Sequence, residues 1–428
     1  MIGGVLTFEK KLKERFDSKL KRHQLVINTM EVAKKQRQFP LMELTMKLLK
    51  RVYCWNDAPG LRFPFIGYLI IGAYPIVWLI PSWLFIATSR HNITKLLKAV
   101  NEQIVFFTIF YKLYSFVKNF QQWEQLFYDI QRAFNTVHED IDIQIQSILG
   151  HVVKSARFLT KNYFSVLLIN CSLYGFVPMV FVVIKYAVTG SYDVPLAAPV
   201  ESNYFIPGYQ TNFWIWLPFD CFLSAILQIH GIVLFSVECF IWNLLHATAC
   251  LFRILQVKAE QLGDSKPKGQ SSKDIQNFIV LHDLVLRSAG KMEEILRGEM
   301  LFLYMSTIFA LCLMMTVMSV AFKDVYLLII MACVFGYCLF QTFAFSILGS
   351  ELIEESTAVA DAIFRSKWYT QDVKSQRDLG FILMRAQKPV KITAAKLFVV
   401  TRDSFTQVIR QAYTIFTLMS QFLDNTEI

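Results

Sequence analysis

Hydrophobic residues along this chain are gathered into long runs that no charged residue interrupts. Four such runs occupy residues 63–89, 162–184, 300–322 and 325–350. A helix that crosses the hydrocarbon core of a bilayer needs about 20 predominantly apolar residues. The four runs therefore predict four membrane-spanning helices.

Three weaker segments are apolar but have a charged residue inside. Each could be a buried helix of a soluble core, but beside the four clear runs we interpret them as spans as well. They are residues 99–111 with Glu102, residues 212–237 with Asp220, and residues 403–423 with Arg410. The pattern thus predicts an all-α membrane protein with seven transmembrane helices. A carboxylate in the hydrocarbon region is costly, so Glu102 and Asp220 are candidates for a functional role. We favour the alternative that they reach the outer interface.

The distribution of basic residues predicts the orientation. The chain has 54% hydrophobic and 18% charged residues and a formal net charge of +10. Segments 1–62, 112–161, 253–297 and 365–402 contain 14, 6, 8 and 9 of the 43 Lys and Arg residues, and a seven-span chain places all four on one side. Basic loops stay cytoplasmic. The N-terminus is therefore expected inside and the C-terminus outside, opposite to G-protein-coupled receptors.

Several predicted helices are longer than a bilayer requires. Residues 213–262 and 273–321 each continue as one helical pattern, so we expect helices 4–7 to form a cytoplasmic projection. Its amphipathic stretches require a partner, either within the chain or in another subunit. Residues 121–134 form another amphipathic stretch that could rest on the inner membrane face.

These expectations divide the chain into six parts. They are a basic cytoplasmic segment (1–62), helices 1–4 (63–261) with the outer loop 190–211, a cytoplasmic loop (262–272), helices 5–6 with their extensions (273–364), the cytoplasmic half of helix 7 with a connector (365–402), and its membrane half with a short outer tail (403–428). In the last part, Pro389 ends one helix and Thr401 or Asp403 is suited to cap the next.

The C-terminal third contains the most specific motif of the chain. Residues 383–389 read LMRAQKP, and they are followed by Thr393-Ala394 and Leu397-Phe398. Trp368-Tyr369 before this block, and Ser404, Phe405 and residues 413–416 after it, complete the pattern. The arrangement resembles the insect odorant receptors. The short loop before the fifth span resembles their ligand-tuning members rather than the co-receptor, which has a long insertion there.

The resemblance implies an odorant-gated, non-selective cation channel, assembled as a heterotetramer with the odorant receptor co-receptor in the dendritic membrane of olfactory neurons. A gustatory-receptor-like channel, or a metabotropic or transporter-like membrane protein without its own pore, remains the alternative. The resemblance places the pore gate at Leu418, Gln421 and Phe422. It places a pocket for a small volatile odorant in the outer half of the bundle. The candidate pocket residues are Phe106, Phe107, Phe110, Asn170, Tyr174, Pro178, Trp216, Phe219, Phe335 and Tyr337.

Other functions find little support in the sequence. The His residues are scattered without an i, i+4 pair, and no phosphate-binding glycine loop occurs, so we expect no enzymatic activity, cofactor or metal site. The basic N-terminal segment suits the anionic inner leaflet better than nucleic acid. The sequon at Asn92 falls on the predicted outer side.

Overall fold

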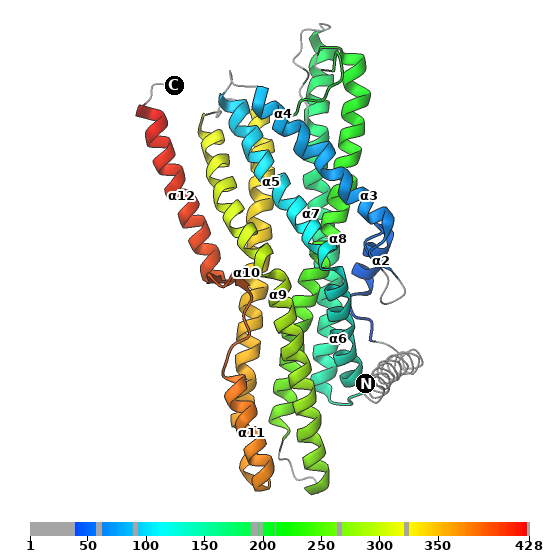
Figure 1. Ribbon diagram of the computed structural model, residues 1–428, viewed down its shortest axis with the longest axis vertical. Coiled ribbons are helices and arrows are strands. Elements are labelled where there is room, and N and C mark those ends of the chain that lie inside the picture. Colours follow the sequence, from blue (N-terminus) through cyan, green and yellow to red (C-terminus); the bar gives the residue numbers. More distant parts are fainter. Residues whose placement is uncertain are drawn as a thin grey trace, which may run out of the picture.

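The computed structural model describes residues 39–56, 62–88, 93–189, 196, 200–209, 211–262, 268–320 and 325–425. Asn92, most of the basic N-terminal segment, part of the predicted outer loop and the side chain of Phe422 lie outside the described residues. Within these residues the protein is a bundle of long helices with one small β-hairpin (Figure 1). We refer to its upper and lower halves as they are drawn in that figure.

Four long helices extend through both halves of the molecule (Figure 1). They are α7 (Ile143–Thr189), α8 (Phe213–Glu260), α9 (Lys268–Val320) and α10 (Val325–Arg365). At 1.5 Å per residue each is about 60–80 Å long, roughly twice the thickness of a bilayer core. Helix α8 lies at the centre, and almost every residue from 233 to 255 is buried. A helix that is hydrophobic all round belongs in a core.

The first apolar run forms a bent helix. It begins as α3 (Phe65–Tyr74), passes through a π-helical turn at Pro75–Leu79 (η1) and continues as α4 (Ile80–Thr88). Pro75 has no backbone N–H to donate, and such positions commonly bend helices. The short helix α2 (Glu43–Arg51) precedes this run, and α5 (Ile93–Lys118) follows it.

Five helical segments of the described chain are long and apolar enough to cross a membrane. The exceptions among the predicted spans are α5 and α12 (Arg402–Asn425), so the count of seven stays a prediction. Two lysines of α5 nevertheless face the protein. Lys112 Nζ lies 3.0 Å from a Glu238 carboxylate oxygen, and Lys98 Nζ lies 3.1 Å from Glu201; both lysines are buried. Paired charges inside a bundle need not contact lipid.

In the lower half, the apolar face of an amphipathic helix is covered by other helices of the same chain. Helix α6 (Phe120–His138) buries Trp123, Phe127, Ile130 and Phe134 against α8 and α9. The expectation that this stretch rests on a membrane face is therefore wrong, because its apolar side is already covered by protein.

The last part of the chain contains two helices joined by a structured connector. Helix α11 (Val373–Ala386) follows a short 3₁₀ turn, η2 (Trp368–Thr370), and is capped by Asp372. Hydrogen bonds from Ser375 hold the pKa of Asp372 below its usual value. The connector forms an antiparallel hairpin of β1 (Thr393–Ala394) and β2 (Phe398–Val399).

Helix α12 then begins with a reciprocal cap. The Thr401 N–H donates to Ser404 Oγ at 2.9 Å, and the Ser404 N–H donates to Thr401 Oγ1 at 3.3 Å. The helix packs on α9 and α10 along the flank of the upper half (Figure 1).

Candidate functional site

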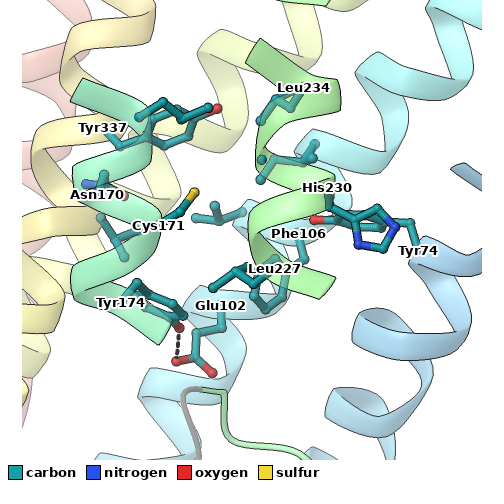
Figure 2. Close-up of a pocket in the computed structure, with 15 residues that line it drawn as sticks. Tyr74, Glu102, Phe106, Asn170, Cys171, Tyr174, Leu227, His230, Leu234 and Tyr337 are labelled. Atoms are coloured by element: carbon teal, nitrogen blue, oxygen red, sulfur yellow. Dashed lines mark hydrogen bonds between the residues drawn. The ribbon is translucent and has the colours of Figure 1, made fainter. Parts of the chain in front are cut away.

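The upper half contains a cavity of about 80 Å³ between five helices. One water molecule requires roughly 10–15 Å³ of such space, so a small organic molecule can fit. Figure 2 shows side chains converging on the cavity from α3, α5, α7, α8 and α10. The lining is mostly hydrophobic and consists of Tyr74, Glu102, Val105, Phe106, Ile109, Leu167, Asn170, Cys171, Tyr174, Leu227, His230, Gly231, Leu234, Val334 and Tyr337.

Glycine residues set the spacing of α7 and α8 at this level. A Cβ atom at Gly231 would lie 2.8 Å from Cys171 Sγ, and one at Gly175 would lie 3.3 Å from Ser224 Oγ. The Ser224 hydroxyl also donates to the Gly175 carbonyl at 3.0 Å. The two helices thus approach closely, and the cavity lies beside the contact.

A carboxylate closes one side of the cavity. Glu102 Oε1 accepts a hydrogen bond from the Tyr174 hydroxyl at 2.5 Å, and its Oε2 accepts from the Glu201 N–H at 2.9 Å. Lys98 Nζ is 3.6 Å from Glu102 and 3.1 Å from Glu201. Figure 2 shows the Tyr174–Glu102 bond at the edge of the cavity. The expectation that Glu102 reaches the interface is wrong, since it is buried and stabilised by these partners.

The imidazole of His230 is fully occupied by hydrogen bonds. Its Nδ1 accepts from the Trp78 indole N–H at 3.1 Å, so the neutral ring carries its proton on Nε2 and donates it to the Ile70 carbonyl at 3.0 Å. His230 therefore holds the bent first helix against α8. It offers a ligand its ring surface rather than a nitrogen atom.

Three other polar groups face the cavity. The Tyr74 hydroxyl is buried and has no hydrogen-bond partner among the described residues, and Figure 2 shows it directed toward the cavity. The Asn170 amide donates to the Cys333 carbonyl at 2.9 Å. The Tyr337 hydroxyl accepts from Gln341 at 2.8 Å. Because a buried hydroxyl without a partner is costly, Tyr74 is the group most ready to bind a polar atom of a ligand.

A buried polar network begins at Tyr337, at the end of the cavity opposite Glu102 (Figure 2). Gln341 Nε2 hydrogen-bonds both Tyr337 and Glu238, and Glu238 also accepts from Lys112 and Tyr163. The network therefore joins α5, α7, α8 and α10 at mid-height. Such fully satisfied networks hold helices in one arrangement.

Four of the ten predicted pocket residues line the cavity, namely Phe106, Asn170, Tyr174 and Tyr337. Phe110 stacks on Tyr74 with ring centroids 6.3 Å apart, and Phe107 packs on Phe302. Pro178 is buried within α7, and Phe335 packs on the main core.

Trp216 and Phe219 lie in a separate cluster around Tyr209. Asp220 belongs to this part of α8 and is completely buried, so the expectation that it reaches the interface is also wrong. Neither of its oxygen atoms has a hydrogen-bond partner among the described residues.

Sequence reasoning missed Tyr74, Cys171, Leu227, His230 and Gly231. In the sequence they are ordinary residues of apolar runs, and only the crossing of α3, α7 and α8 brings them together. Glu102 did carry a signal, as a charge inside an apolar segment.

The predicted gate lies on α12, away from the cavity. Leu418 and Gln421 are exposed in the single chain. Five exposed residues follow one face of this helix at alternating spacings of four and three, namely Gln407, Gln411, Thr414, Leu418 and Gln421. This face is polar except at Leu418.

Comparisons with known proteins agree on one family. Residues 92–413 match the 7tm Odorant receptor family. Odorant receptor Or2 of Anopheles gambiae is 21% identical over 86% of this chain and 96% of its own length. The odorant receptor coreceptor of Drosophila melanogaster is 35% identical, but over only 20% of this chain and 18% of its own length. The fold is that of the olfactory receptor OR5 from Machilis hrabei, solved in complex with eugenol, with a TM-score of 0.74, 15% identity, and coverage of 89% of this chain and 97% of that one.

Proposed function

Because the chain belongs to the 7tm odorant receptor family, we propose that it is the ligand-tuning subunit of an odorant-gated, non-selective cation channel. The family membership confirms the resemblance inferred from the C-terminal motif and indicates a multi-pass membrane protein. The observation that carries the proposal is the apolar cavity in the upper half, combined with a polar face on α12 that the single chain leaves uncovered.

The cavity suits a small volatile molecule. Such ligands have large apolar surfaces and few polar atoms, and pockets for them are apolar with a few oriented polar groups. Here Phe106, Leu227 and Leu234 supply apolar surface, while the Tyr74 hydroxyl, which has no partner among the described residues, supplies a hydrogen-bond donor. The ligand class is therefore odorants of modest size with at most one or two acceptor oxygens.

The face of α12 suits a pore. Polar side chains at membrane depth require water or protein beside them. A ring of subunits that turned this face inward would line a lumen with the neutral side chains of Gln407, Gln411, Thr414 and Gln421, and the exposed Arg410 would flank it. An apolar ring at Leu418, extended by Phe422 one turn later, would close such a lumen by dewetting.

The partner we propose is the odorant receptor co-receptor, in a heterotetramer. The match to co-receptors is confined to about a fifth of the chain at higher identity, whereas Or2 matches over nearly its whole length. A shared segment within otherwise divergent proteins suits a conserved contact between subunits. We place the complex in the plasma membrane of olfactory dendrites, with the N-terminus inside.

The decisive experiment is co-expression with the co-receptor and whole-cell recording with G-protein signalling blocked in the pipette solution. We expect inward current within a panel of small volatile esters, alcohols and ketones, and none from the co-receptor alone with the same panel. Silence across the panel with verified surface expression would contradict the proposal. An epitope tag after Ile428 should be accessible on intact cells, and an inaccessible tag would refute the orientation.

A further inference from the structure

The lower half contains a cluster of metal-ligating side chains far from the cavity. His151 lies on α7, and His246 and Cys250 lie on α8. Their potential ligand atoms all lie within 4.8 Å of one another. Two of the three residues are almost a hundred positions apart in the sequence, so only the packing of α7 on α8 creates the cluster.

His246 and Cys250 already have the separation that one metal ion requires. Their spacing of four places both on the same face of α8, and His246 Nε2 lies 3.6 Å from Cys250 Sγ. Ligands bound tetrahedrally at Zn–N and Zn–S distances of about 2.0–2.3 Å lie roughly 3.5 Å apart. His151 is exposed, so its ring can rotate through the remaining distance.

A carboxylate from a third helix orients the central imidazole. Glu351 of α10 lies with Oε2 3.1 Å from His246 Nδ1, and a carboxylate can only accept there. The proton on Nδ1 is therefore held by Glu351, and Nε2, on the Cys250 side, is the nitrogen that would bind a metal ion once it is deprotonated. Ligating histidines in metalloproteins commonly have such a carboxylate partner, which fixes the tautomer and increases the basicity of the ring.

The neighbouring cation Arg253 is engaged by two carboxylates. Arg253 donates from Nε to Glu355 at 2.7 Å and from Nη2 to the second oxygen of Glu351 at 3.1 Å. Two carboxylates thus neutralise the guanidinium, and Glu351 remains anchored while it orients His246.

We propose that His151, His246 and Cys250 form a Zn²⁺ site that links α7 and α8 and, through Glu351, α10. Two imidazoles and one thiolate match the borderline-soft Zn²⁺, whereas Ca²⁺ and Mg²⁺ prefer oxygen ligands. Water completes the tetrahedron at the exposed side. Cys250 binds as the thiolate, and its proton is released to solvent when the metal enters. Zn²⁺ would thereby brace the lower half of the bundle.

The test measures Zn²⁺ affinity of the purified full-length complex by competition with a chromophoric chelator. His151→Gln and Cys250→Ala each remove a ligand. For Glu351→Gln, which changes only the partner of a ligand, we expect the roughly 10- to 100-fold loss of Zn²⁺ affinity that is typical of an outer-shell change. We expect each of the two ligand variants to lose more Zn²⁺ affinity than that. Cys239→Ala is the matched control, because Cys239 is also buried on α8 but is not a member of the cluster.

Co²⁺ provides a second measurement that reports on the thiolate. The wild-type complex should show a thiolate-to-cobalt charge-transfer band that Cys250→Ala abolishes and Cys239→Ala retains. Because His151 is exposed, His151→Gln keeps the fold intact and separates ligand loss from misfolding. Equal Zn²⁺ affinity in wild type and His151→Gln, or a cobalt band that survives Cys250→Ala, would overturn the proposal.

Discussion

The polar groups that surround the cavity differ in whether they have an unused hydrogen-bond donor or acceptor for a ligand. Both nitrogens of His230 are hydrogen-bonded, and the amide N–H₂ of Asn170 donates to a backbone carbonyl. The Tyr74 hydroxyl lacks a partner among the described residues. A ligand oxygen that reached it would gain a hydrogen bond and remove the cost of an unpaired buried group.

The variant Tyr74→Phe should therefore discriminate between ligands. We expect odorants with an acceptor oxygen to lose about 1 kcal/mol, or roughly fivefold in half-maximal concentration, while hydrocarbon analogues are unaffected. The measurement is a set of dose–response curves for matched pairs of ligands. Tyr209→Phe is the control, because its hydroxyl is also buried without a described partner but does not line the cavity. Equal shifts for both ligand types would contradict this role of Tyr74.

Tyr174 has a different role, because its hydroxyl is committed to the buried Glu102 carboxylate. Tyr174→Phe should lower the free energy of unfolding by about 1.5–3 kcal/mol, the range for hydrogen bonds to charged groups. It should also change odorant preference without abolishing current. Thermal denaturation of the purified complex tests the first expectation. Tyr204→Phe, which loses a bond to the neutral Val77 carbonyl, should cost less.

At the scale of elements, close contacts at glycine residues decide how the helices meet. Gly231 brings α8 to Cys171 of α7, and Gly349 of α10 faces the backbone carbonyl of Val400 in the connector. The two contacts differ in how easily the neighbouring atom can move away. The end of a cysteine side chain can rotate away, whereas a backbone carbonyl held in a hairpin cannot.

Gly231→Ala should consequently alter the cavity more than the fold. The added methyl group displaces the Cys171 thiol, and the bulkiest ligands should lose roughly tenfold in potency, as for one methylene in an apolar pocket. The double variant Gly231→Ala/Cys171→Ala should restore the potency of these bulky ligands. Gly336→Ala, where nothing lies within 4 Å, is the control. If Cys171→Ala failed to rescue potency, the assigned contact would be wrong.

Gly349→Ala should instead displace the connector that leads into α12. A Cβ atom there would overlap the Val400 carbonyl, and overpacking of this kind typically costs 1–3 kcal/mol. Because the connector packs on α10 and leads into α12, we expect altered channel opening at unchanged odorant affinity, measured as a changed maximal current. Unchanged currents would show that the connector tolerates the shift.

At the scale of the whole molecule, the cavity and the polar face of α12 are separate, but helix α10 contacts both the cavity and α12. Helix α10 lines the cavity with Val334 and Tyr337, and nearly two turns farther Phe343 packs on Phe405 of α12, with ring centroids 5.2 Å apart. A ligand that shifts α10 can therefore act on α12 directly. Such coupling requires that the ligand bind the open arrangement more tightly than the closed one.

Leu418→Ala tests the proposed closure. Loss of the apolar ring should wet a closed pore, so current in the absence of odorant should increase several-fold. Ile409→Ala removes a similarly exposed aliphatic side chain from another face of α12 and should leave the basal current unchanged. Equal basal currents in both variants would place the gate elsewhere, and Phe422→Ala would then be the next position to examine.

The sequence by itself determined the class of structure, because apolar runs longer than 20 residues have few stable solutions and the motif at residues 383–389 is specific. It also indicated the unusual position of Glu102, since a charge inside an apolar run is detectable without a structure. The seven-span count and the orientation still stand as predictions from the same patterns.

Only the tertiary structure decided which residues meet. Helical periodicity makes Phe106 and Phe110 equally good candidates for the pocket. The crossing of α3 with α5 and α8 decides between them, because it puts Phe106 at the cavity and Phe110 beside Tyr74. The same holds for His151 and Cys250, which no spacing rule connects. The physical reason is that hydrophobicity specifies burial without specifying a partner, and the partner is set by where two helices pack closely enough to touch.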